Sequence, residues 1–262
     1  MARGRTARVL VRRFEAAGDR GRHPDELIVE EPMEIRLDGH LVTTTMRTPG
    51  HDFELAAGFC FTEGLLAGAA VLQVRYCGSS AAVETEFNEV TVETGDLAPR
   101  PQPRLTTTTS SCGLCGSTTI TELTERLHRL TPGPAMTPEV LAEVPAAARQ
   151  RQELFGLTGA VHAAATFAPD GTIGIVREDV GRHNAVDKVV GHLLLEGGLP
   201  ATGLGLYVSG RASFEIVQKA WAAGFRTVVA VSAPSSLAVE VATTAGITLA
   251  GFVRAGRVNL YT

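Results

Sequence analysis

The sequence lacks the features that mark membrane and secreted proteins. No apolar run approaches the ~20 residues that a membrane-spanning helix needs. The basic residues 1–14 are not followed by the apolar segment and cleavage site of a signal peptide. We therefore expect a cytoplasmic protein. In that compartment the four cysteines, at positions 60, 77, 112 and 115, are expected to be thiols and not a disulfide framework.

Lysine is scarce, and there is no excess of positive charge. Lysine occurs only at positions 188 and 219, so nearly all basic side chains are arginine, which suits bidentate contacts with phosphate. The net charge of −4 speaks against a general nucleic-acid binder. Five arginines lie within the first thirteen residues. They predict a solvated arm or an edge strand, with binding to an anionic partner as the alternative.

The chain does contain enough apolar material for a folded core. Hydrophobic residues make up 44% and charged residues 20% of the 262 positions, which argues against disorder. This length allows one large domain or one and a half, and we find no internal repeats.

Residues 1–105 are expected to form a β-rich segment with one helix. Asp38-Gly39 lies between two alternating stretches and predicts a hairpin. Residues 48–66 then have the apolar spacing of a helix, which makes Cys60 a core residue. Two strands are expected within 71–77 and 86–94, and Cys77 at the end of the first is interpreted as structural.

A proline-rich linker at 95–111 leads into the second expected domain, 106–262. Three prolines within five positions exclude a helix in the linker. Apolar residues at a spacing of three to four then predict a helix from about Ser117 to Leu130. Thr137 and Pro138 have the N-cap and first-turn pattern of a further helix.

From residue 155 onward, strands and helices alternate. Two strands are expected around Asp170-Gly171, and three further strand and helix pairs follow. Continuously apolar strands indicate a buried, largely parallel sheet covered by helices. Such sheets bind ligands at the carboxyl ends of their strands. The segments expected there are "REDVGRHN", "VSGRAS", "VSAPSS" and the C-terminal "VRAGRVNLYT".

These strand ends have the composition of a phosphate-binding cradle. Ser213 has the position of an N-cap after Gly210, and backbone amides at such a helix start can hold a phosphate. The segments match neither the Walker nor the Rossmann fingerprint. Three such turns at one sheet edge, together with Arg254 and Arg257, nevertheless resemble a cradle for a large, multiply phosphorylated ligand.

Two histidines are further candidates. His183 precedes Asp187 by four residues, which is one helical turn, so the carboxylate could orient the imidazole. The alternative is an ordinary capped helix with a surface ion pair. His162 lies in "HAAA", which lacks the glutamate that zinc deaminases use in H-x-E. A histidine of this kind is more often a hydrogen-bonded core residue.

The most reactive pair is Cys112 and Cys115, in "SSCGLCG". A cysteine just before a helix has its pKa lowered by the amide end of that helix, and the flanking glycines leave the thiols accessible. The pair could be a redox dithiol or half of a zinc site. A zinc site lacks a second ligand pair, and a redox dithiol lacks the strand that usually precedes it. A thiol that carries sulfur also fits.

Six segments in order, from about Arg8 to Thr262, carry a resemblance to one family. They are "TMRTPGHDFELAAGFCFTEGLL", "SSCGLCG", "TGAVHAAATF", "REDVGRHNAVDKVVG", "SGRASFEIVQKA" and "GFVRAGRVNLYT". On these segments the chain resembles the FdhD/NarQ family of sulfur carriers. The resemblance implies an α/β fold, with a cytidine-deaminase-like mixed sheet sandwiched by helices and a small β-rich N-terminal subdomain. It also implies a homodimer.

The resemblance implies a sulfurtransferase that formate dehydrogenase requires. Cys112 would accept sulfur from a cysteine desulfurase as a persulfide, and Cys115 would assist or share this role. The sulfur would pass to the bis-molybdopterin guanine dinucleotide molybdenum cofactor, bound as a substrate, before that cofactor enters the formate dehydrogenase apoenzyme. A cofactor-binding chaperone without persulfide chemistry and a zinc deaminase-like hydrolase are the alternatives.

The residues expected to bind the cofactor come from two sources. The resemblance assigns a C-terminal stretch, Phe252, Val253, Arg254, Ala255, Gly256 and Arg257. The strand-end turns add Ser209, Gly210, Arg211, Ser213, His183 and Asn184. No bound metal of the protein's own, no nucleic acid and no membrane partner are expected.

Overall fold

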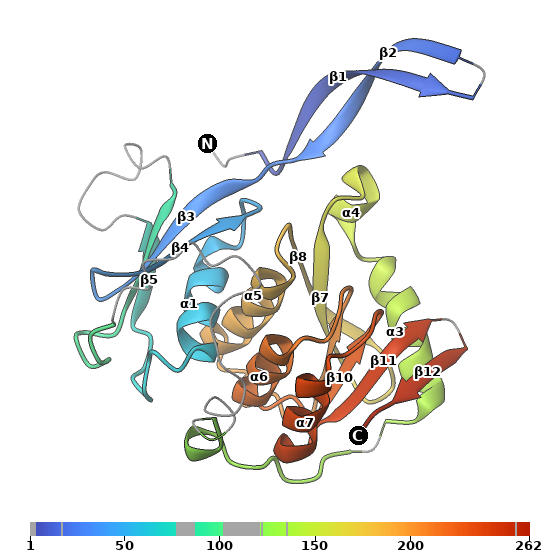
Figure 1. Cartoon of the computed structure of the whole chain (residues 1–262). Helices are drawn as coiled ribbons and strands as arrows, with labels where there is room; N and C mark the ends of the chain where they lie inside the picture. Colours follow the sequence, from blue (N-terminus) through green and yellow to red (C-terminus); the bar gives the residue numbers. More distant parts are fainter. Residues whose placement is uncertain are drawn as a thin grey trace.

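Three β-sheets and the helices around them are seen in the computed structural model, which describes residues 4–16, 18–76, 87–101, 121, 123–134, 136–254 and 256–262 (Figure 1). Cys77, the CxxC pair, Ala255 and the expected domain boundary at 105/106 lie outside these residues. No helix in the described part is long and apolar enough to cross a membrane.

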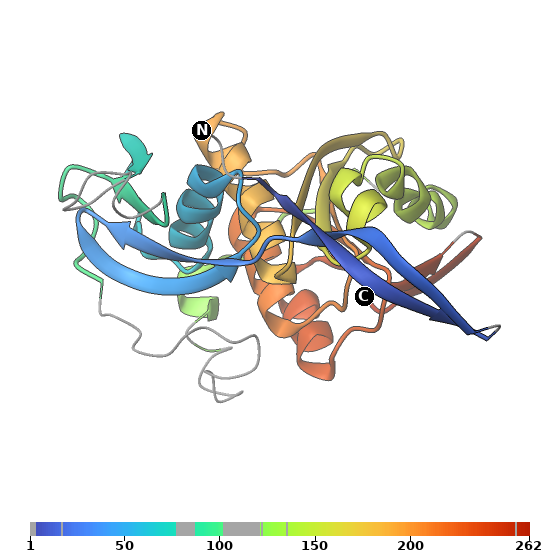
Figure 2. The same cartoon turned by 90° about the horizontal axis from the view of Figure 1, so that it is seen from above.

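The first sheet is a two-stranded ribbon that projects from the body of the molecule (Figures 1 and 2). Its strands are β1 (Thr6–Glu15) and β2 (Gly18–Ile28), which pair antiparallel and are mostly exposed. Arg12 and Arg20 pair with acidic residues within the ribbon. Arg8, Arg12 and Arg13 therefore lie on a solvated edge strand, as expected, whereas Arg5 precedes the strand and is half-buried, and Arg3 lies outside the described residues.

The second sheet has four strands in the order β4-β3-β6-β5. They are β3 (Glu31–Leu37), β4 (His40–Arg47), β5 (Gln73–Tyr76) and β6 (Glu89–Glu93). The hairpin predicted at Asp38-Gly39 joins β3 to β4, and both turn residues have positive φ, 48° and 79°. Helix α1 (Asp52–Thr62) covers this sheet and buries Cys60 completely, which confirms Cys60 as a core residue.

The third sheet has six strands in the order β12-β11-β10-β9-β7-β8. They are β7 (His162–Phe167), β8 (Ile173–Asp179), β9 (Gly205–Val208), β10 (Thr227–Ala230), β11 (Thr248–Arg254) and β12 (Arg257–Leu260). Strands β9, β10 and β11 are parallel, whereas the other neighbours are antiparallel. The expectation of a largely parallel sheet is therefore wrong, because tight turns join β7 to β8 and β11 to β12, and a tight turn can link only antiparallel strands.

Helices cover both faces of this sheet. Helices α5 (Arg182–Leu195), α6 (Phe214–Ala223) and α7 (Ser236–Ala245) pack on one face against Leu206, Val208 and Val228. Helix α3 (Pro138–Arg149) packs on the other face against Tyr207 and Val229, and α4 (Glu153–Thr158) follows it. Successive residues of a strand thus point to opposite faces of the sheet and pack into two different cores.

Two predicted helix boundaries have different outcomes. Thr137 caps α3 by accepting a hydrogen bond from the Val140 amide, as its sequence predicts. The helix predicted from Ser117 to Leu130 is described only from Thr121, and it ends at Arg126. Beyond it the chain is held in a non-helical path, because Trp221 Nε1 donates to the His128 carbonyl and the Leu130 amide donates to the Ala245 carbonyl.

Helices α1 and α5 cross at two glycines. A Cβ added at Gly58 would lie 1.9 Å from the Asp187 carbonyl oxygen, and one added at Gly191 would lie 1.8 Å from the Glu54 carbonyl oxygen. No side chain fits in either gap. The two backbones therefore touch directly, which fixes the second sheet and α1 against the third sheet.

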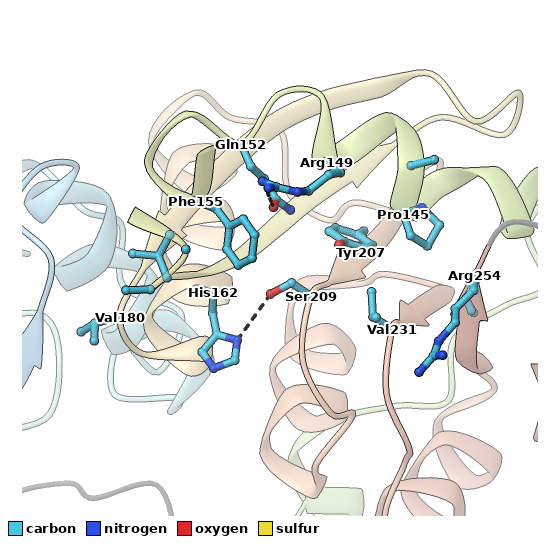
Figure 3. A pocket seen from close by; sticks show the side chains of 15 residues that line it. Pro145, Arg149, Gln152, Phe155, His162, Val180, Tyr207, Ser209, Val231 and Arg254 are labelled. Carbon is cyan, nitrogen blue, oxygen red and sulfur yellow. Dashed lines mark hydrogen bonds between the residues drawn. The ribbon is translucent and has the colours of Figure 1, made fainter. Parts of the chain in front are cut away.

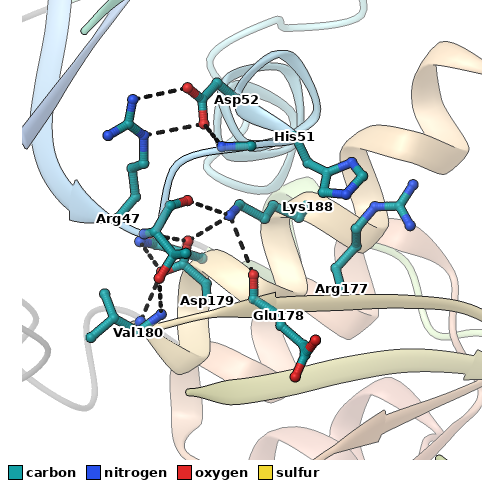
Figure 4. A network of polar contacts seen from close by, with 12 residues as sticks. Arg47, His51, Asp52, Arg177, Glu178, Asp179, Val180 and Lys188 are labelled. Carbon is teal, nitrogen blue, oxygen red and sulfur yellow. Dashed lines mark hydrogen bonds and ion pairs between the residues drawn. The ribbon is translucent and has the colours of Figure 1, made fainter. Parts of the chain in front are cut away.

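Buried ion pairs hold the same junction. Lys188 Nζ lies 2.7 Å from Asp179 Oδ2 and donates to the Thr48 carbonyl just before α1 (Figure 4). Lys219 Nζ lies 3.0 Å from Asp187 Oδ2 and donates to Thr62 Oγ1 at the end of α1. Both of the chain's lysines are thus interior residues.

Two further pairs lie at the start of α1. Arg47 is fully buried and makes two hydrogen bonds to the Asp52 carboxylate (Figure 4). Arg177 of β8 makes two hydrogen bonds to Glu54, and His192 Nδ1 lies 3.0 Å from the same carboxylate. Although burial opposes the charge, the Arg177 contacts outweigh it and lower the pKa of Glu54 to about 2.

We expect Gly191→Ala to lower the free energy of unfolding by about 2–3 kcal/mol, because the new methyl group has to push α1 and α5 apart. Urea denaturation measures this loss. Gly156→Ala in α4 is the matched control, since nothing lies within 4 Å of its added Cβ. Equal stability of the two variants would contradict the close contact.

We expect Glu54 to make stability depend on pH in the acid range. Its folded pKa of about 2 lies below the ordinary 4.5, so its contribution is complete above pH 4.5 and is lost as the pH falls toward 2. The difference in unfolding free energy between the wild type and Glu54→Gln should therefore shrink over this range. Exposed Glu196→Gln should show no such change; a constant difference for Glu54→Gln would refute the assignment.

Candidate functional site

The turns that follow three neighbouring strands are hydrogen-bonded to one another. After β9 and β10, the Ser232 amide donates to the Gly210 carbonyl, and a single β-bridge joins Ala212 to Pro234. The Phe252 amide of β11 donates to the Ser232 carbonyl. Strand β8 runs in the same direction as these strands, because it is antiparallel to β7, which is antiparallel to β9. The predicted convergence on one edge is confirmed for the segments after β8, β9 and β10 and for the C-terminal segment up to Arg254. Strand β12 carries the rest of that segment back toward the start of β11, where Thr262 Oγ1 accepts from the Leu249 amide.

A cavity of about 640 Å³ opens at this edge (Figure 3). One wall comes from the sheet and its strand ends, and includes His162, Val180, Tyr207, Ser209, Val253 and Arg254. The opposite wall comes from α3, α4 and the residues between them, chiefly Pro145, Arg149, Gln152 and Phe155. No carboxylate is found among the lining residues that the structure describes.

His162 and Ser209 lie together where β7 begins and β9 ends. Ser209 Oγ accepts from the Ala163 amide at 2.9 Å and lies 3.4 Å from His162 Nδ1. Burial and then the charges of Arg182 and His183 lower the pKa of His162. His162 is thus hydrogen-bonded, as expected, but it is half-buried and lines the cavity, so the expectation of a core residue is wrong.

His183 links the starts of α5 and α6. Its Nε2 lies 2.7 Å from Glu215 Oε2 and 3.2 Å from Ser213 Oγ, and this contact lowers the pKa of Glu215. Asp187 does not orient this imidazole, and the alternative of an ion pair is the one found, because His183 pairs with Glu215 of α6. Asp187 points into the interior, where it accepts from Thr62 Oγ1 and pairs with Lys219.

The side-chain amide of Asn184 is hydrogen-bonded within the protein. Its Nδ2 donates to the Met46 carbonyl of β4 at 2.8 Å and to Asp179 Oδ1 at 3.0 Å. It therefore fastens the second sheet to the cavity edge. Arg211, in contrast, is exposed in the turn after β9.

The C-terminal stretch meets the cavity at two residues. Val253 and Arg254 line it, whereas Phe252 lies outside the lining and is 36% exposed. Gly256, with φ of 71°, lies in the turn between β11 and β12, which brings Arg257 opposite Arg254 across the ladder. Their role in ligand binding stays a prediction.

Sequence reasoning missed the α3–α4 wall. Arg149, Gln152 and Phe155 recur at every third position across the break between two helices, and Arg149 Cζ lies 3.9 Å from the Phe155 ring centroid. In the sequence, this three-residue spacing is the signal that could have indicated a shared wall. Nothing in the local sequence connects these residues with Tyr207 or Val253, which are distant in the chain.

The CxxC pair lies outside the described residues, but its flank can be located. Leu123 packs in the core under α5, α6 and α7, and Arg126 Nη1 donates to the Glu63 carbonyl after α1. This flank lies on the face of the sheet opposite α3 and the cavity. Among the described residues, Cys60 is the one cysteine, and burial raises the pKa of its thiol, so it is unreactive.

The described residues contain no group of three or more histidine, cysteine, aspartate or glutamate side chains that could hold a metal ion. The cavity instead offers donors, namely the Arg149 and Arg254 guanidinium groups, His162 and Ser209. Fold and site together define an α/β protein with a mixed sheet, whose strand ends line a cavity that presents hydrogen-bond donors.

The chain belongs to the FdhD/NarQ family, whose model matches residues 28–262. It is 48% identical to the "Sulfur carrier protein FdhD" of Nocardia farcinica, over 98% of this chain and 92% of the relative. It is also 48% identical to the protein of the same name from Streptomyces coelicolor, over 91% and 87% of the two chains.

A solved structure has the same fold. The crystal structure of a putative formate dehydrogenase accessory protein from Desulfotalea psychrophila superposes with a TM-score of 0.77, at 23% identity, over 99% of this chain and 97% of that one. The mixed α/β architecture is therefore that of a known protein. The expected likeness to cytidine deaminases stays a prediction.

We expect the pKa of His162 to lie below 6.5, and Arg182→Gln to raise it, because one of the positive charges that disfavour the imidazolium is removed. NMR titration of the imidazole resonances measures both values. Arg129→Gln is the control, since Arg129 is exposed and its guanidinium group bonds to carbonyl groups at the end of α7. A His162 pKa unchanged in Arg182→Gln would contradict the electrostatic assignment.

Proposed function

We propose that this protein is a sulfur carrier for formate dehydrogenase. It accepts sulfur from a cysteine desulfurase as a persulfide and passes it to the bis-molybdopterin guanine dinucleotide cofactor, which is its bound substrate. The observation that carries the proposal is membership of the FdhD/NarQ family over 28–262, together with relatives named sulfur carriers at 48% identity.

Cys112 is the proposed carrier and Cys115 its helper. The Cys112 thiolate attacks the outer sulfur of the desulfurase persulfide, which releases the desulfurase thiolate and leaves a persulfide on Cys112. Cys115 then attacks the inner sulfur, so that a Cys112–Cys115 disulfide forms and hydrosulfide leaves. Molybdenum takes up this sulfide as a ligand, and an external dithiol reduces the disulfide again.

The cavity at the strand ends supports the substrate class. It presents the guanidinium groups of Arg149 and Arg254 and the donors of His162 and Ser209, with no carboxylate among its described lining residues. Guanidinium groups bind phosphates through paired, charge-assisted hydrogen bonds. A cofactor with two pyrophosphates suits such a cavity.

Transfer also requires the carrier cysteines to reach the cavity. The described flank of the CxxC lies on the other face of the sheet, against α1, α6 and α7. The proposal therefore requires Cys112 to deliver sulfur either to this cavity or to the cavity of a second subunit in a homodimer. We place the reaction in the cytoplasm, where thiols stay reduced.

We expect incubation with a cysteine desulfurase and cysteine to add the mass of one sulfur atom to the protein, on a peptide that contains Cys112. Intact-mass and peptide mass spectrometry measure it. Cys112→Ala should abolish the adduct and Cys115→Ala should retain it; the opposite pattern would exchange their roles.

Cys60→Ala is the control, because that thiol is buried, and it should accept sulfur normally. A variant with both Cys112 and Cys115 changed to alanine should fail to activate formate dehydrogenase. Full activation by that variant would instead support a chaperone without persulfide chemistry.

A further inference from the structure

The ribbon of β1 and β2 exposes large apolar side chains. Leu10 is 67% exposed and Phe14 is 65% exposed. A two-stranded ribbon by itself is only marginally stable in water, because it has no core to pack against. Apolar side chains that gather on such a surface mark a site of contact with another molecule.

Two arginines face each other on this ribbon. Arg12 and Arg22 are register partners on the antiparallel strands, so their side chains lie on the same face. Like charges in directly opposite positions destabilise a strand pair. Arg12 Nε donates to Asp19 Oδ2 at 2.8 Å, whereas the Arg22 guanidinium group pairs with no residue that the structure describes. The ribbon thus has an uncompensated positive charge.

Apolar side chains lie on both sides of this charge. Leu10 and its register partner Pro24 are two positions away from Arg12 and Arg22, which puts them on the same face. The Arg12 Cζ atom lies 5.1 Å from the centroid of the Phe14 ring. We call these five exposed residues, Leu10, Arg12, Phe14, Arg22 and Pro24, the arginine face. Its chemistry matches a partner that combines carboxylates with apolar side chains.

The ribbon stands beside the wall of the strand-end cavity. Strand β2 contacts α4, which carries Phe155 of that wall, and both lie at the same end of the molecule (Figures 1 and 2). The described flank of the CxxC lies on the other face of the third sheet. Under the proposed function, a sulfur donor has to approach the cysteines, whereas the receiver of the cofactor has to approach the cavity. The ribbon is placed to meet the receiver.

We propose that the arginine face docks an acidic and partly apolar segment of the formate dehydrogenase apoenzyme, which takes the cofactor from the cavity. This inference rests on the proposed function. Carboxylates of the segment pair with Arg22 and Arg12, and its apolar side chains pack on Leu10 and Phe14. Nucleic acids and anionic membranes suit the ribbon less, because it also carries four carboxylates and the protein has a net charge of −4.

The test is the affinity of the full-length protein for purified formate dehydrogenase apoenzyme, measured by biolayer interferometry at several salt concentrations. Arg22→Glu should weaken binding about tenfold, because it sets a carboxylate against those of the partner. Wild-type binding should weaken as the salt concentration rises. Arg22→Lys keeps the charge and should bind nearly as well as the wild type.

The variants are chosen so that the ribbon stays folded. Arg22→Glu removes the like-charge contact with Arg12 and should not lower the melting temperature. Arg100→Glu makes the same change of charge at an exposed residue after β6, outside the ribbon, and should bind like the wild type. An equal loss of affinity in Arg100→Glu would show that only net charge matters, and would refute the docking face.

Other anionic partners are tested with the same variants. Duplex DNA and vesicles that contain phosphatidylglycerol should bind the wild type more weakly than the apoenzyme does. If either binds more tightly, and Arg22→Glu abolishes that binding, the assignment to the apoenzyme is overturned.

Sulfur uptake separates this inference from the proposed function. Arg22→Glu should accept sulfur from the desulfurase as the wild type does, and should activate formate dehydrogenase fully, but only at about tenfold higher concentration. If the wild type neither accepts sulfur nor activates the enzyme, the proposed function fails. If the wild type does both, and Arg22→Glu binds and activates at the same concentration, the docking face is refuted and the proposed function stands.

Discussion

Helices α1 and α5 touch backbone to backbone at Gly58 and Gly191, and the packing of the second sheet and α1 against the third sheet depends on this contact. Lys188 donates to the Thr48 carbonyl before α1 and pairs with the buried Asp179 carboxylate. Lys219 donates to Thr62 Oγ1 at the end of α1 and pairs with the buried Asp187 carboxylate. Burial acts to lower the pKa of Lys219, but Asp187 and Glu63 outweigh it, so the pKa is raised and the charge is kept. Removing one partner of such a pair leaves an uncompensated buried charge, which costs about 3–5 kcal/mol.

Polar residues at the start of α5 connect the α1–α5 contact with the edge of the third sheet where the cavity lies. Asp179 pairs with Lys188, accepts from the amides of Thr48 and Gly181, and accepts from Asn184. Asn184 also holds the Met46 carbonyl of β4. The second sheet therefore fixes the strand-to-helix turn from behind, and the turn sets the position of Arg182 and His183. Asn184, which the sequence suggests as a ligand contact, is thus hydrogen-bonded within the protein and helps to hold this turn in place.

The cavity combines two walls with different physical roles. The strand ends supply a fixed set of donors, because hydrogen bonds between the turns after β9, β10 and β11 hold them in register. The α3–α4 wall supplies flat and apolar surface, with Phe155 under Arg149 and Gln152 beside them. The cavity thus has cationic groups on both walls, Arg254 at the strand ends and Arg149 on the Phe155 ring.

The sequence by itself determined what depends on neighbouring residues. The Asp38-Gly39 hairpin, the Thr137 cap and the meeting of polar strand ends follow from local backbone preferences and from strands that share a direction. Only the tertiary structure decided which distant residues meet. Asp187 pairs with Lys219 and not with His183. The outer strands of the third sheet are antiparallel to their neighbours, and Arg149 and Gln152 line the same cavity as Arg254. The reason is that burial, unlike turn geometry, is a property of the whole packed chain, and no local pattern encodes it.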